Sequence, residues 1–96
     1  MTQTQPEAPA PRLGQLFTPD QQREYNRSLD ESLERVKRAL SIVSGKSLNA
    51  EQSEIANKIR TFQKQAEEAR DQDLLTAVTL AKRADVLAQD LLQRLP

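Results

Sequence analysis

Histidine, cysteine and tryptophan are absent from the 96 residues, and the chain has only two glycines, two phenylalanines and one tyrosine. Without cysteine and histidine it has no disulfide, no thiolate nucleophile, no imidazole base and none of the commonest zinc ligands. Two glycines leave little for β-hairpins or for a glycine-rich phosphate loop. We therefore predict that the chain is not an enzyme, with no catalytic residues, no cofactor and no metal.

Long apolar runs are also missing, and neither sign of charge is in excess. No apolar run approaches the roughly 18 residues that a membrane span needs, and the N-terminus has no basic stretch followed by an apolar one. Fourteen basic residues balance fourteen acidic ones. Single-strand nucleic-acid binding favours aromatic side chains among the basic ones, but no aromatic residue interleaves the basic residues that we expect to gather at one end of the bundle: Arg35, Lys37, Arg38, Lys46 and Arg94. We expect no membrane span, no export signal and no nucleic-acid partner.

The first 17 residues differ in composition from the rest. Pro6, Pro9 and Pro11 lie among Gln, Thr and Ala, a mixture that buries too little apolar surface to offset its ordering entropy. We predict a disordered, proline-rich arm over residues 1–17. The exceptions are the apolar residues at its end, which we expect to form a short clasp over the first helix: Leu13, Leu16 and Phe17.

Residues 18–96 read as three helices. Thr18 can cap a first helix over residues 19–44, Pro19 suits its first position, and Gln21 completes a capping box. Gly45 is suited to the left-handed backbone conformation that often follows a helix end. The apolar residues recur three or four apart, as on one helical face: Tyr25, Leu29, Leu33, Val36, Leu40 and Val43.

The second helix is predicted over residues 50–70 and the third over 73–95. Asn49 and Gln52 repeat the capping-box pattern. The second stripe is Ile55, Ile59, Phe62, Ala66 and Ala69, and we predict that Phe62, its only aromatic residue, is the central core side chain. The third stripe is broader: Leu74, Val78, Ala81, Ala84, Ala88, Leu91 and Leu95, widened by Leu75, Leu80, Leu87 and Leu92.

The joint at residues 68–73 decides the architecture, because it contains neither Gly nor Pro. A single helix over 50–95 is therefore an alternative. The step of five from Ala69 to Leu74 breaks the phase of the stripe, and Asp71 or Asp73 could cap a new helix. We predict a turn here and an all-α fold, an antiparallel three-helix bundle with small side chains on its third helix: Ala77, Ala81, Ala84 and Ala88.

Charged residues suggest few specific sites. Glu67, Glu68, Asp71 and Asp73 could gather a hard cation in principle, but carboxylates at a helix start also stabilise the helix dipole, and a calcium loop needs more oxygen ligands and a glycine turn. We expect no metal there. Four acid-before-base pairs at a spacing of four predict ion pairs on solvated faces: Glu31–Arg35, Glu34–Arg38, Glu54–Lys58 and Asp90–Arg94.

Two segments, 59–70 and 80–92, carry a resemblance. With their Ala, Leu and charged residues at helical spacing, they resemble small uncharacterised bacterial helical proteins, some of which look like lipid-anchored envelope proteins with a proline-rich tether. The resemblance covers about residues 12–95. It implies the periplasmic side of the bacterial cell envelope if Met1 starts a trimmed chain, with the cytoplasm as the alternative.

These patterns favour a non-catalytic helical protein–protein interaction module whose partner the sequence does not identify. Self-association through apolar surface left over from a small core is one expectation. The alternative is a structural scaffold segment that homodimerises through a long helix over residues 50–95.

Overall fold

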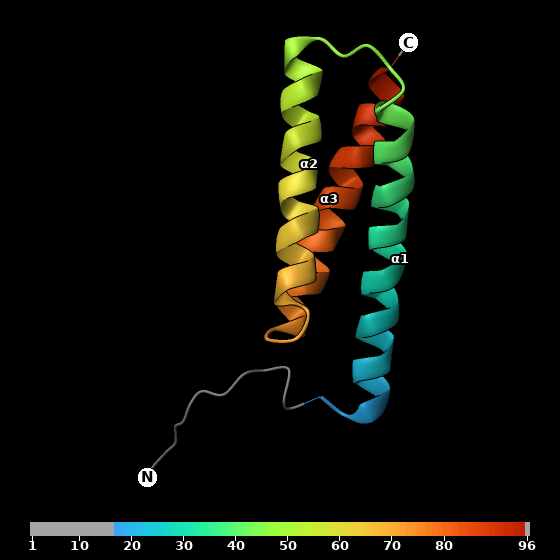
Figure 1. Cartoon of the computed structure of the whole chain (residues 1–96). Coiled ribbons are helices and arrows are strands. Elements are labelled where there is room, and N and C mark those ends of the chain that lie inside the picture. The colour runs from blue at the N-terminus through green and yellow to red at the C-terminus, as the bar shows by residue number, and fades with distance from the viewer. Residues whose placement is uncertain (1–16, 96) are drawn as a thin grey trace.

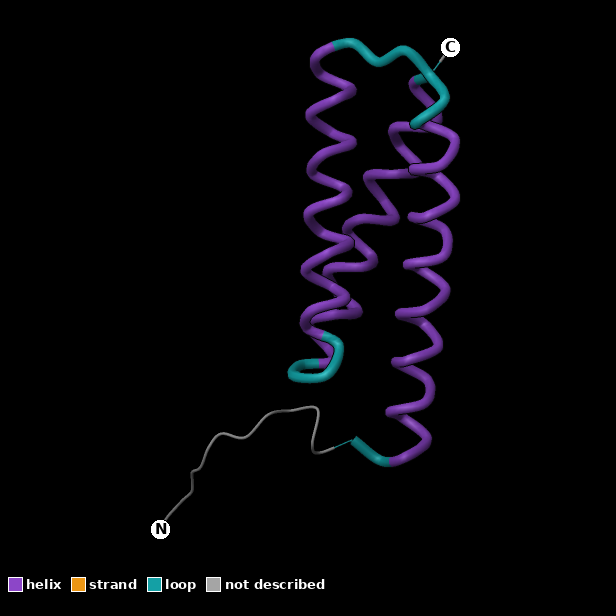
Figure 2. The backbone as a smooth tube through the Cα atoms, in the orientation of Figure 1, coloured by secondary structure: helices purple, strands orange, loops and turns teal. Residues whose placement is uncertain are grey.

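The computed structural model describes residues 17–95, which form three helices and no strand. They are α1 (Pro19–Val43), α2 (Ala50–Ala69) and α3 (Leu74–Arg94). The chain turns back after α1 and again after α2, so that the three helices lie alongside one another (Figures 1 and 2). The all-α prediction with three helices is confirmed. The arm predicted over residues 1–17 lies outside the described part of the chain except for Phe17.

Side chains at the helix ends explain where α1 and α2 begin. The Thr18 hydroxyl accepts a hydrogen bond from the Gln21 backbone N–H at 3.1 Å, while the Gln21 side chain accepts from the Thr18 N–H at 3.0 Å. Asn49 and Gln52 make the same reciprocal pair at 2.8 and 3.1 Å. Both predicted capping boxes are present, and each satisfies N–H groups that a helix start leaves without partners.

The turn between α2 and α3 spans residues 70–73. The N–H groups of Gln72 and Asp73 donate to the Ala69 carbonyl at 3.0 and 2.8 Å, and Asp73 then caps α3 by accepting from the Thr76 N–H at 3.2 Å. The structure therefore has two helices where a single helix over 50–95 was the alternative. The helices expected over 19–44, 50–70 and 73–95 exceed the observed bounds only at capping residues: Ser44, Arg70, Asp73 and Leu95.

Gly45 does not adopt the left-handed conformation expected of it. The N–H groups of Gly45 and Lys46 donate to the carbonyls of Ile42 and Val43 at 3.1 and 3.0 Å. These i to i+3 bonds tighten the helix end with right-handed geometry, so no residue with positive φ is required. A Cβ at this position would meet only the Ile42 carbonyl oxygen, at an ordinary 3.6 Å.

Gly45→Ala is therefore expected to stabilise the protein by about 0.4–1 kcal/mol, because alanine restricts the unfolded chain and fits the folded one. Urea unfolding followed by circular dichroism measures the change. A loss of stability of about 1 kcal/mol would instead indicate that residue 45 needs a left-handed backbone.

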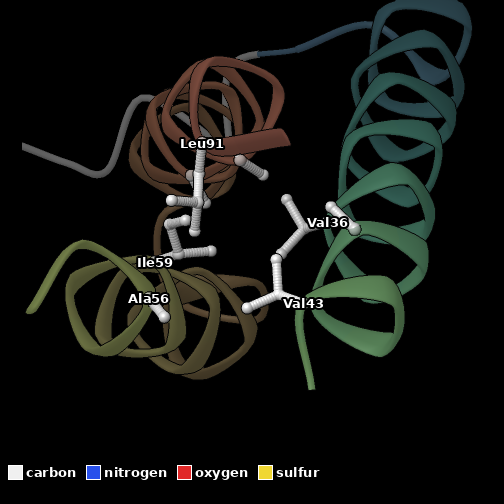
Figure 3. Packing of buried hydrophobic residues seen from close by; sticks show 8 residues of the cluster. Val36, Val43, Ala56, Ile59 and Leu91 are labelled. Atoms are coloured by element: carbon white, nitrogen blue, oxygen red, sulfur yellow. The ribbon is translucent and has the colours of Figure 1, made fainter. Parts of the chain in front are cut away.

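The core lies where all three helices meet, and α3 contributes more buried residues to it than either α1 or α2. α3 packs extensively against both α1 and α2, whereas α1 and α2 contact each other little. The small residues predicted to allow close approach are all fully buried: Ala77, Ala81, Ala84 and Ala88. Figure 3 shows Val36 and Val43 of α1 approaching Ile59 of α2 and Leu91 of α3. The broad stripe on α3 is thus explained by its two neighbours.

Phe62 is not the central core side chain, so that prediction is wrong. Ile59, one turn earlier, is fully buried at the centre, while Phe62 is only partly buried and packs against the edge of the cluster. At the other end of the molecule, the Phe17 ring lies on Tyr25, with ring centroids 4.8 Å apart. Both rings are half-buried against a second cluster of buried residues that includes Leu29 and Leu74.

Two ion pairs tie the helices together. Arg35 of α1 donates through Nε to the Asp85 carboxylate of α3 at 2.7 Å. Arg70, in the turn between α2 and α3, pairs with Asp30 of α1. Of the four surface pairs predicted, Asp90–Arg94 is present at 3.2 Å. The Glu31–Arg35, Glu34–Arg38 and Glu54–Lys58 pairs are not among the ion pairs within residues 17–95.

Candidate functional site

The outer surface of the α2/α3 pair carries a shallow apolar groove of about 500 Å³. We call it the α2/α3 groove, and six residues line it: Phe62, Thr79, Lys82, Arg83, Val86 and Leu87. The five that come from α3 follow the spacing i, i+3, i+4, i+7 and i+8, which places them along one side of a helix. α3 therefore has a second continuous face, formed by these five residues, besides the face that packs in the core.

Val86 distinguishes this groove from ordinary surface. Its side chain is 68% exposed, and within residues 17–95 only Ile42, at 50%, is another large hydrophobic residue with comparable exposure. A single exposed apolar residue is normal in a soluble protein. Val86, however, lies in a hollow whose other apolar walls are the half-buried side chains of Phe62 and Leu87. The groove thus combines a concave shape with apolar surface that the fold leaves uncovered.

Positive charge borders the groove. Lys82 and Arg83 line it, and both side chains are exposed. No carboxylate is among the six lining residues. The ion pairs within residues 17–95 use other cations: Asp20–Arg23, Glu24–Arg27, Asp85–Arg35, Asp30–Arg70 and Asp90–Arg94. The cations beside the groove are therefore available to a negatively charged ligand.

A second hollow, of about 480 Å³, lies at the turn between α2 and α3. Its lining is mostly polar: Phe17, Gln22, Asn26, Arg70, Asp71, Gln72 and Leu74. Its one cation is already engaged, because Arg70 pairs with Asp30 and donates to the Asn26 side-chain oxygen at 3.4 Å. These contacts attach the turn to α1. We therefore interpret this hollow as part of the scaffold.

The carboxylates considered as cation ligands are not brought together as a site. Glu67, Glu68 and Asp71 are exposed, and Asp73 accepts hydrogen bonds from the backbone N–H and the hydroxyl of Thr76 as the cap of α3. Across residues 17–95 no three side chains of His, Cys, Asp or Glu are grouped so that they could hold a metal ion.

A third hollow lies on the exposed side of α1, among mostly charged residues between Asp20 and Glu31. Its Arg27 donates to Glu24, and this hydrogen bond, followed by the carboxylate charge, raises the pKa of the Arg27 guanidinium above its ordinary value. Arginine is protonated at any accessible pH. Arg27 therefore stays positively charged and serves as neither a proton donor nor a proton acceptor at this surface.

Comparison with known proteins supplies no relative for this chain: no family model, no curated protein and no solved structure matches it. None of the helices within residues 17–95 is both long enough and apolar enough to cross a bilayer. The α2/α3 groove is the candidate functional site of the described residues.

Proposed function

We propose that this chain is a non-catalytic helical interaction module, built as an antiparallel three-helix bundle, that binds a partner protein through the α2/α3 groove. The observation that carries the proposal is the exposed Val86 in an apolar hollow beside Phe62 and Leu87. Apolar grooves are a recurring way of binding amphipathic helices, because the groove buries the apolar anchor side chains that such a helix presents on one face. Membership of the bacterial envelope group stays a prediction.

The scaffold alternative needs residues 70–73 to straighten into one helix over 50–95. The turn is held by hydrogen bonds to the Ala69 carbonyl and by the Arg70–Asp30 ion pair. A continuous helix would also remove α3 from its contacts with α2. No feature of the described residues favours that arrangement, so the interaction module is the function we put forward.

A displayed library of helical peptides with randomised apolar anchors tests the proposal. Peptides selected on the folded protein are expected to bind Val86→Gln at least about tenfold more weakly, because the variant removes the exposed apolar contact in the groove. Ile42→Gln is the matched control, since Ile42 is also exposed but lies on α1 outside the groove. It should leave binding unchanged.

Both substitutions put a good helix former at an exposed helical position, and circular dichroism melting verifies that each variant is folded. Failure to select any peptide that distinguishes Val86→Gln from the parent protein would overturn the proposed function. Equal loss of binding in the Ile42→Gln control would do the same, because the binding surface would then lie outside the α2/α3 groove.

A further inference from the structure

The lining of the α2/α3 groove also indicates which kind of partner would bind there. The inference that follows rests on the proposed function. We infer that the groove binds an acidic amphipathic helix, whose apolar side chains enter the groove and whose Asp and Glu residues face Lys82 and Arg83. Three features of the groove support this inference: the charge of its lining, the direction in which the lining residues run, and the repulsion that two symmetric copies would meet there.

The positive charge of the groove lining favours an acidic partner. Two of the six lining residues are cations, none is an anion, and neither Lys82 nor Arg83 belongs to an ion pair within residues 17–95. A basic partner would meet repulsion at both of these positions, whereas an acidic partner gains attraction and faster association. The chain as a whole is neutral, so the positive charge at the groove is a local property and not a consequence of net charge.

The direction of the groove along α3 favours a helical partner segment. Its lining on α3 runs from Thr79 to Leu87, which is about 12 Å along the helix axis at ~1.5 Å per residue. Two turns of a second helix span the same length and present apolar anchors at i, i+3 or i+4, and i+7. An extended peptide that adds to a sheet edge has no place to bind, because residues 17–95 contain no strand.

Symmetry argues against a second copy of this chain as the occupant. A two-fold dimer brings the same patch of both copies together. Lys82 and Arg83 of each copy would then surround one shared apolar centre, where like charges repel.

The charge requirement is tested with the peptides selected on the parent protein. We expect the selected sequences to carry an excess of Asp and Glu beside their apolar anchors. The double variant Lys82→Glu/Arg83→Glu should weaken their binding at least about tenfold, and raising the salt concentration should weaken binding to the parent protein.

A matched control is available on α1. Lys37 and Arg38 are also adjacent, exposed and outside the ion pairs of the described residues. Lys37→Glu/Arg38→Glu therefore changes the net charge by the same amount but should alter binding by less than about threefold, as expected for charges remote from the contact.

The outcomes separate this inference from the proposed function. Peptides that depend on Val86 but are neutral or basic, or that bind Lys82→Glu/Arg83→Glu as well as the parent, would leave the interaction module standing and overturn the acidic partner. Equal weakening by the two double variants would also overturn it, since net charge alone would explain the loss. A dimer in light scattering that Val86→Gln dissociates would assign the groove to a second copy instead.

Discussion

Replacing Ile59 with alanine is expected to lower the free energy of unfolding by about 2–5 kcal/mol. Ile59 is fully buried and lies in the core cluster that joins α1, α2 and α3. Truncation removes apolar contacts and leaves a cavity that three packed helices can close only in part. A small domain has a total stability near the lower end of about 5–15 kcal/mol. The variant should therefore be partly unfolded at room temperature.

Urea unfolding followed by far-UV circular dichroism gives the difference. Val86→Ala is the control, since it also shortens a β-branched side chain in a helix but at a position that is 68% exposed. It should change the stability by less than about 0.5 kcal/mol. Similar losses in the two variants would show that Ile59 is not at the centre of the core.

Ala84→Leu is expected to destabilise the protein by about 1–3 kcal/mol or more, the cost of inserting extra methylene groups into a packed interior. Ala84 is fully buried on α3 within the core cluster. Leucine and alanine have similar helix propensities, so the loss reports packing between helices rather than the stability of α3 itself. Thermal melting of the two proteins measures it.

Arg83→Leu is the control for this substitution. Arg83 is the neighbouring residue on α3, is exposed, and belongs to no ion pair within residues 17–95. Leucine at position 83 should leave the melting temperature within a few degrees of the parent value. If Ala84→Leu melts at the same temperature as Arg83→Leu, the close approach of helices at Ala84 is wrong.

Features set by local chemistry could be predicted from the sequence. The caps at Thr18 and Asn49 depend on residues three positions apart, and both formed as predicted. The turn at residues 70–73 was indicated by the break in apolar spacing before Leu74 and by Asp73, which caps α3. The buried alanines of α3 followed from their helical spacing. Each of these inferences needs only one helix or one helix end.

Features set by the contact between helices were missed. Apolar spacing identifies the side of α2 that is buried but not its centre, and Phe62 lies about 60° around the helix from Ile59 at ~3.6 residues per turn. Arg35 reaches Asp85 across α1 and α3 instead of pairing with Glu31, because the neighbouring helix brings a carboxylate that the local sequence does not contain. The spacing of Thr79, Lys82, Arg83, Val86 and Leu87 was a signal for the α2/α3 groove, but its polar members concealed it.

Because α1 and α2 both pack mainly against α3, the order in which the helices are synthesised affects when their apolar faces can be covered. α1 and α2 contact each other little, and each buries its apolar stripe mainly against α3. A ribosome makes the chain from the N-terminus, so these two helices are completed before the residues that cover them. Neither stripe has its partner until α3 has been synthesised. Until then, Leu29, Val36 and Ile59, which are fully buried in the folded protein, lack the α3 residues that help to cover them.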